Sequence, residues 1–109
     1  MSYDISLVID TGGLAPATIG GADFWNYTSN CARMWRLAGA DLAEFDGKTA
    51  GACLIVLEAA VMTMKRDPLP YLALNPDNGW GSYDTLLPAL DELAAMFRAH
   101  PKATVVVSR

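Results

Sequence analysis

The stretch YDISLVID, residues 3–10, decides the fold class. Apolar and polar side chains alternate along it, which is the pattern of a β-strand with one buried face. Helices farther along the chain can cover that face, as they do in α+β proteins. The residues of one face are Tyr3, Ile5, Leu7 and Ile9, and those of the other are Asp4, Ser6, Val8 and Asp10.

Two further segments are expected to complete a small sheet. Residues 24–28, FWNYT, are the most strand-like part of an extended segment, and Pro16 near its start is typical of an edge strand or a bulge. The stretch ATVVVS, residues 103–108, is rich in β-branched side chains. Because a terminal strand must pair to be stable, we expect it to join residues 3–10.

Three helices are predicted between these strands. Residues 31–38 form a short helix with one apolar stripe. Asp46 is a good N-cap for the main helix over residues 47–66, in which apolar residues recur at spacings of three and four. Ser82 is expected to cap a third helix that runs to about residue 100.

The elements together predict one α+β domain over residues 1–109. Its small antiparallel sheet, made of the N-terminal strands plus the C-terminal strand, packs against about three helices. The chain is 52% hydrophobic and 18% charged, which is enough apolar content for a packed core.

Charge and composition exclude several classes of partner. The formal net charge is −4 and the eight Lys and Arg are scattered, so we expect no polynucleotide partner. The main apolar run, residues 50–64, is broken by Glu58 and is too short for a membrane span. Cys31 and Cys53 form no metal-ligand pattern, so they are expected to be free thiols in a reducing cytoplasm without a metal site.

Catalysis finds little support in the sequence. His100, the one histidine, stands at a predicted helix end, where a cation interacts well with the helix dipole. No phosphate-binding, zinc-protease or nucleophile-elbow motif occurs. We therefore expect no catalytic residue and no cofactor, although a nucleotide hydrolase with Asp77 or Asp84 as acid or base stays open as a third hypothesis.

Two segments share a composition that suits ligand binding. Residues 24–30, FWNYTSN, and residues 75–83, NPDNGWGSY, each place Trp, Tyr and two Asn before a predicted helix. Helix N-termini attract anions, aromatic rings stack on flat ligands, and Asn both donates and accepts hydrogen bonds. If the segments converge, they predict a pocket for a nucleotide formed by Trp25, Asn26, Tyr27, Asn30, Arg33, Asn78, Trp80 and Tyr83.

The same residues also have a purely structural interpretation. Asn30 and Ser82 can serve as helix caps, and the tryptophans can be core anchors. Gly79 and Gly81 can serve only to permit positive φ in a tight corner. The sequence leaves both interpretations open.

The main helix is apolar beyond one stripe, because Ile55, Val56 and Met62 add a patch outside it. Such a patch is either buried or meets another copy of the protein, so we expect a homodimer. It also supports a second hypothesis, a structural or protein–protein interaction module without a small-molecule ligand.

Several motifs resemble a family of small, mostly uncharacterised bacteriophage proteins. They are NYTSN followed by MW at residues 34–35, DGKTA at residues 46–50, NPxNGWGSY at residues 75–83 and HPKATV at residues 100–105. The resemblance implies a phage accessory protein in the host bacterial cytoplasm. By analogy it implies an anti-defence sponge that sequesters a nucleotide-type immune signal, such as a cyclic nucleotide or an ADP-ribose derivative.

Overall fold

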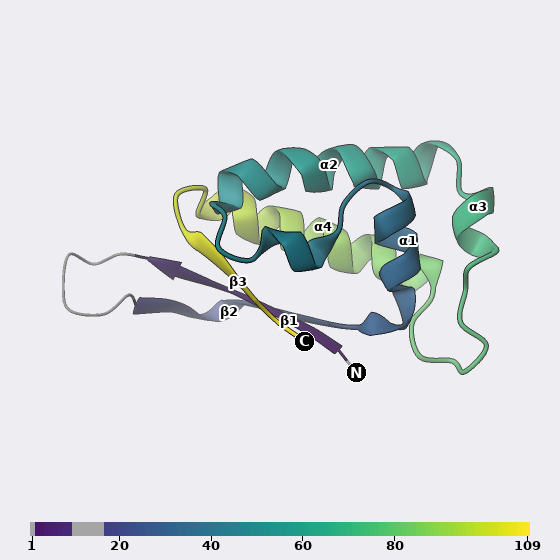
Figure 1. Cartoon of the computed structure of the whole chain (residues 1–109), viewed down its shortest axis with the longest axis horizontal. Helices are drawn as coiled ribbons and strands as arrows, with labels where there is room; N and C mark the ends of the chain where they lie inside the picture. Colours follow the sequence, from purple (N-terminus) through teal and green to yellow (C-terminus); the bar gives the residue numbers. More distant parts are fainter. Residues whose placement is uncertain (1, 10–16) are drawn as a thin grey trace.

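A computed structural model describes residues 2–9 and 17–109. Within them, a three-stranded antiparallel sheet is covered on one face by helices, which confirms the α+β prediction (Figure 1). The strands are β1 (Ser2–Ile9), β2 (Ala17–Thr28) and β3 (Thr104–Ser108). The helical segments are η1 (Ser29–Cys31), α1 (Ala32–Leu37), η2 (Leu42–Phe45), α2 (Ala50–Arg66), α3 (Leu69–Leu72) and α4 (Tyr83–Ala99). Asp10 and Pro16, which bounded two of the predicted segments, lie outside the described residues.

Strand β1 lies in the middle of the sheet, in the order β2-β1-β3. Its Ile5 is opposite Trp25 on β2 and Val107 on β3, so the predicted pairing of the closing strand with the first strand is confirmed. Ile5 is fully buried and Trp25 nearly so, because side chains at paired positions share one face of a sheet.

The outer edge of β3 is covered by the segment that leads into α2. Gly47 N donates to Val105 O and Val105 N donates to Lys48 O, each at 2.8 Å. The Asp46 carboxylate accepts from Val107 N, also at 2.8 Å. Asp46 is therefore not the N-cap of α2, as the sequence predicted. Thr49 has that role, with its hydroxyl accepting from Ala52 N, and the helix begins three residues later than expected.

The helices form more than one layer on the sheet. Figure 1 shows α4 nearer the strands and α2 along the side of the molecule that faces away from them, and α2 packs along α4. Helix α4 begins as predicted, with Ser82 as its N-cap in a capping box with Thr85. In the part of the chain that the structure describes, no helix is long and apolar enough to cross a membrane.

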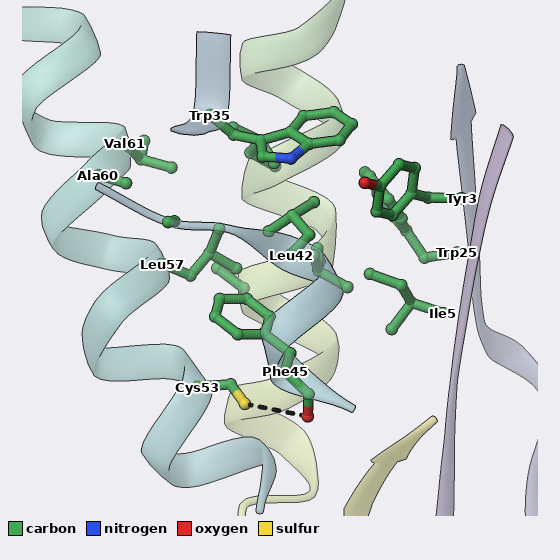
Figure 2. Packing of buried hydrophobic residues seen from close by; sticks show 14 of the residues in the cluster. Tyr3, Ile5, Trp25, Trp35, Leu42, Phe45, Cys53, Leu57, Ala60 and Val61 are labelled. Carbon is green, nitrogen blue, oxygen red and sulfur yellow. Dashed lines mark hydrogen bonds between the residues drawn. The ribbon is translucent and has the colours of Figure 1, made fainter. Parts of the chain in front are cut away.

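The core lies between the sheet and α2 and is filled by large side chains from every layer (Figure 2). Trp35 of α1 is fully buried, and its ring meets that of Tyr3 edge-on at 5.0 Å. Leu42 and Phe45 of η2 fill the space beside Leu57 of α2. The candidate site lies beside this core, between the end of β2 and the loop that leads into α4.

Candidate functional site

A hollow of about 700 Å³ lies where the end of β2 meets the loop before α4. Ligand pockets for small molecules commonly measure about 300–1,000 Å³, and the volume of this open hollow lies within that range. Five of the eight residues predicted for the ligand contribute to its lining, and they come from both predicted segments. The lining residues are Ser2, Asn26, Tyr27, Thr28, Asn30, Asn78 and Trp80.

The Tyr27 hydroxyl joins the two segments. It lies 2.6 Å from Thr85 Oγ1, donates to Ser82 O at 3.2 Å and accepts from Ser82 N at 3.3 Å. Burial raises the pKa of Tyr27, and the hydrogen bonds from Thr85 and Ser82 oppose that rise. The hydroxyl therefore stays protonated near neutral pH and works as a structural donor and acceptor.

A second hydrogen bond joins the loop before α4 to η1. The Asn30 side-chain amide donates to Trp80 O at 3.3 Å. Gly81 follows at φ +87°, and a Cβ there would come within 2.6 Å of Thr28 Cγ2 and 2.9 Å of Cys31 Sγ. The loop backbone thus approaches β2 so closely that only glycine fits at this position.

The Trp80 ring projects from this anchored loop. Asn78 Oδ1 accepts from Trp80 N at 2.9 Å, and Gly79 at φ +77° makes the bend between them. The ring remains 68% exposed although its own backbone is held on both sides. An exposed tryptophan on a fixed backbone offers a flat stacking surface beside the hollow.

Three residues predicted for the ligand lie elsewhere. Trp25 is 4% exposed, and its Nε1 donates to Ala89 O of α4 at 2.7 Å. Tyr83 is 7% exposed, and its hydroxyl donates to Met64 O at 2.7 Å. Arg33 is exposed but does not line the hollow. Trp25 and Tyr83 therefore belong to the core. The structural interpretation of the tryptophans as core anchors holds for Trp25 and Trp35 and is wrong for Trp80, which is 68% exposed.

Two lining residues, Ser2 and Thr28, were not singled out from the sequence. They are opposite each other in the β1–β2 register, so both stand at the same end of the sheet. Only the register brings Ser2 to the hollow, and no local signal could have found it. Thr28 lies within the predicted segment 24–30.

The polar groups around the hollow are amides and hydroxyls. Asn26 Nδ2 donates to Asp4 Oδ1 and to Ser2 Oγ, both on the neighbouring strand β1. Neither Asp77 nor Asp84, the acids named for a hydrolase, lines the hollow. Burial raises the pKa of the Cys31 thiol behind Tyr27, which disfavours a thiolate there. The described residues contain no group of three metal-ligand side chains.

No protein-family model, curated protein or solved structure matches the chain.

Proposed function

We propose that the hollow binds a small, flat, nucleotide-type ligand and that the protein is a binder without enzymatic activity. One observation carries the proposal. The exposed Trp80 ring and the amides of Asn26, Asn30 and Asn78 meet at one hollow although they come from two segments far apart in the sequence.

The chemistry of these groups favours the base of a nucleotide. Stacking of a base on an aromatic side chain contributes about 1–3 kcal/mol. Asn26 Nδ2, Asn30 Nδ2 and Asn78 Oδ1 already bond within the protein, so the other atoms of these amides would pair with a base edge. No Lys or Arg is among the described residues that line the hollow, and Arg33 lies outside them. The phosphates of the bound ligand would therefore face solvent rather than a cationic pocket.

A biological role follows from the resemblance to phage proteins and not from the geometry. In that role the protein is a phage anti-defence sponge in the host bacterial cytoplasm, and it sequesters a cyclic nucleotide or an ADP-ribose derivative. A homodimer would present two hollows and so would hold two ligands. Sequestration requires only that each ligand be bound, not converted.

Calorimetric titration of the full chain with mononucleotides, cyclic dinucleotides and ADP-ribose tests the proposal. We expect one of them to bind, and Trp80→Ala to weaken its binding by about 5–150-fold, which corresponds to the stacking energy. Phe24→Ala is the matched control, because Phe24 is also an exposed ring, at 57%, and does not line the hollow. Absence of binding across the panel would overturn the proposal.

Recovery of the ligand after heat denaturation separates binding from catalysis. A sponge returns the ligand chemically intact, which chromatography of the supernatant would show. Conversion of the ligand would instead favour the hydrolase hypothesis.

The second candidate function is a protein–protein interaction module without a small ligand. Exposed apolar side chains on α2 favour it, since Ile55 is 74% and Met62 59% exposed on one side of the helix and Val56 is 42% exposed beside η2. Surface patches of this kind commonly mark interfaces. A titration without binding, together with association of the protein through α2, would favour this function over the first.

A further inference from the structure

Helices α2 and α4 carry a repeated pattern of charge on their shared outer face. Lys65 Nζ lies 3.3 Å from an Asp91 carboxylate oxygen, and Arg98 lies 3.4 Å from a Glu58 carboxylate oxygen. The two ion pairs show that the helices run antiparallel. Each helix has an acid followed seven residues later by a base. A half-turn about an axis perpendicular to the face, through its centre, therefore exchanges the two helices. It places Glu58 on Asp91 and Lys65 on Arg98, so each charge falls on a charge of the same sign.

The four charges alternate in sign around this face. Each acid has a base beside it across the groove and another base two turns along its own helix. A surface with this pattern is complementary to a second copy of itself turned face to face. We propose that the α2–α4 face binds a second copy of this chain, as a twofold symmetric four-helix bundle.

The shape of the face selects one arrangement of the two copies. A groove of about 440 Å³ runs between the helices, with buried Val61 and Ala94 at its floor. Met62 lines it from α2 and is 59% exposed. The equivalent position on α4 is the small, exposed Ala95. Met62 therefore fits over the partner's Ala95 if α2 of each copy lies over α4 of the other.

This arrangement has its twofold axis parallel to the helices. Glu58 then faces the partner's Arg98, and Lys65 faces the partner's Asp91. Each α2 would run antiparallel to the α4 beneath it, as in four-helix bundles. The alternative axis, perpendicular to the helices within the interface, places Met62 on the partner's Met62 and Glu58 near the partner's Lys65.

The size of the face is adequate for a dimer. Each of the two helices has 17 residues, about 25 Å, and packed helices lie about 8–10 Å apart. With side chains each helix is about 10–12 Å across, so the face is about 20 Å wide and covers about 500 Å² in projection. Interfaces of standard size bury about 800 Å² of accessible surface per partner. Val56 lies outside the interface, because it lines a different groove beside η2.

Sedimentation of the full chain over a concentration series tests the proposal. We expect a species of twice the 11.7 kDa chain mass. Lys65→Glu with Arg98→Glu makes all four charges negative and should weaken dimerisation at least about tenfold. Lys48→Glu with Lys102→Glu changes the net charge equally at exposed sites outside the face and should leave the dimer intact. A monomer at every concentration, or equal behaviour of the two variants, would overturn the interface.

Exchange of one ion pair distinguishes the two axes. Glu58→Arg with Arg98→Glu preserves the pair within each chain. It keeps the contacts between copies attractive when α2 lies over α4, and makes them repulsive when α2 lies over α2. We expect this variant to remain a dimer, and its dissociation would contradict the parallel axis.

Disulfide trapping tests the same geometry without altering charge. Met62→Cys and Ala95→Cys are mild changes at exposed positions, and the native Cys31 and Cys53 are buried. Under an oxidant, a mixture of the two single variants should give a covalent dimer, whereas Met62→Cys alone should not. A covalent dimer of Met62→Cys alone would support the perpendicular axis and contradict the proposal. The interface does not rest on the ligand hollow, so either proposal can fail while the other holds.

Discussion

A methyl group at Gly81 would meet Thr28, Cys31 and Tyr27 at 2.6–3.2 Å, in addition to a positive φ. We expect Gly81→Ala to lower the free energy of unfolding by about 2–4 kcal/mol, from backbone strain plus overpacking. Gly79→Ala is the control, because Gly79 also has positive φ but a methyl group there would have nothing within 4 Å. It should cost about 1 kcal/mol. Urea denaturation measures both, and equal losses would show that the close approach of the loop to β2 is unimportant.

Two tyrosine hydroxyls, one half-buried at Tyr27 and one buried at Tyr83, make stability sensitive to alkali. Burial raises the pKa of Tyr27 and of Tyr83 above the ordinary value of 10.0. A tyrosine with a raised folded-state pKa stabilises the fold below its unfolded-state pKa, and that contribution is lost as the pH rises through the folded-state pKa. In urea denaturation from about pH 8 to about pH 11, stability should therefore fall above about pH 9, where the unfolded-state tyrosines begin to ionise.

The two tyrosines can be separated by substitution. Tyr27→Phe should reduce the alkaline loss, and adding Tyr83→Phe should reduce it further. Both variants are expected to be less stable than the native protein at neutral pH, because Ser82 and Thr85 lose a shared partner and Met64 O loses a donor. An unchanged alkaline slope in the double variant would contradict this assignment.

At this scale, the sequence could identify which residue types suit a ligand but not which of them face one. Trp25 and Trp80 have similar neighbours in sequence, yet one is buried against α4 and the other is exposed. Burial of Trp25 follows from its register opposite Ile5, and exposure of Trp80 follows from a loop that Asn30 and Tyr27 hold. Both causes are contacts between distant segments, which local patterns do not contain.

Helix α4 contains a proline that its own hydrogen bonding does not favour. Pro88 is exposed, lies inside the helix and lacks the N–H that would donate to Asp84 O. Replacement by Ala restores the hydrogen bond to Asp84 O and removes the clash of the proline ring with the preceding turn. These gains are partly offset, because alanine restricts the backbone of the unfolded chain less than proline does. We expect Pro88→Ala to raise the free energy of unfolding by about 2 kcal/mol. Thermal and urea unfolding measure this change in the free energy of unfolding. Glu92→Ala, at an exposed site of the same helix, is the control. A Pro88→Ala variant less stable than the native protein would contradict the expectation.

Element types were predictable, and element boundaries less so. Strand β1 and the cap of α4 follow from period-two alternation and from Ser82, both of which are local signals. The start of α2 was predicted wrongly because Asp46 and Thr49 are both capable caps. The Asp46 carboxylate instead accepts a hydrogen bond from Val107 N of β3, which is possible only once the sheet has formed.

The whole molecule depends on its last strand. Val105 is fully buried, Ala103 O accepts from Ala50 N at the start of α2, and β3 covers one edge of β1. Removal of residues 103–109 should therefore abolish cooperative unfolding, which circular dichroism during urea denaturation would show. Removal of Arg109 alone loses an exposed cation 5.9 Å from the Tyr3 ring and should cost at most about 1 kcal/mol. A cooperative transition in the longer deletion would contradict this dependence.

The central position of β1 also sets an order of events during synthesis. Val8 is opposite Thr18 on one side and Thr104 on the other. A ribosome adding about 5–20 residues per second makes the second partner several seconds after the first. In that interval β1 has one satisfied edge and one open row of backbone donors and acceptors, which other chains can pair with. Slower translation between residues 18 and 104 would lengthen this exposure, so the yield of folded protein should depend on the speed at which this stretch is made.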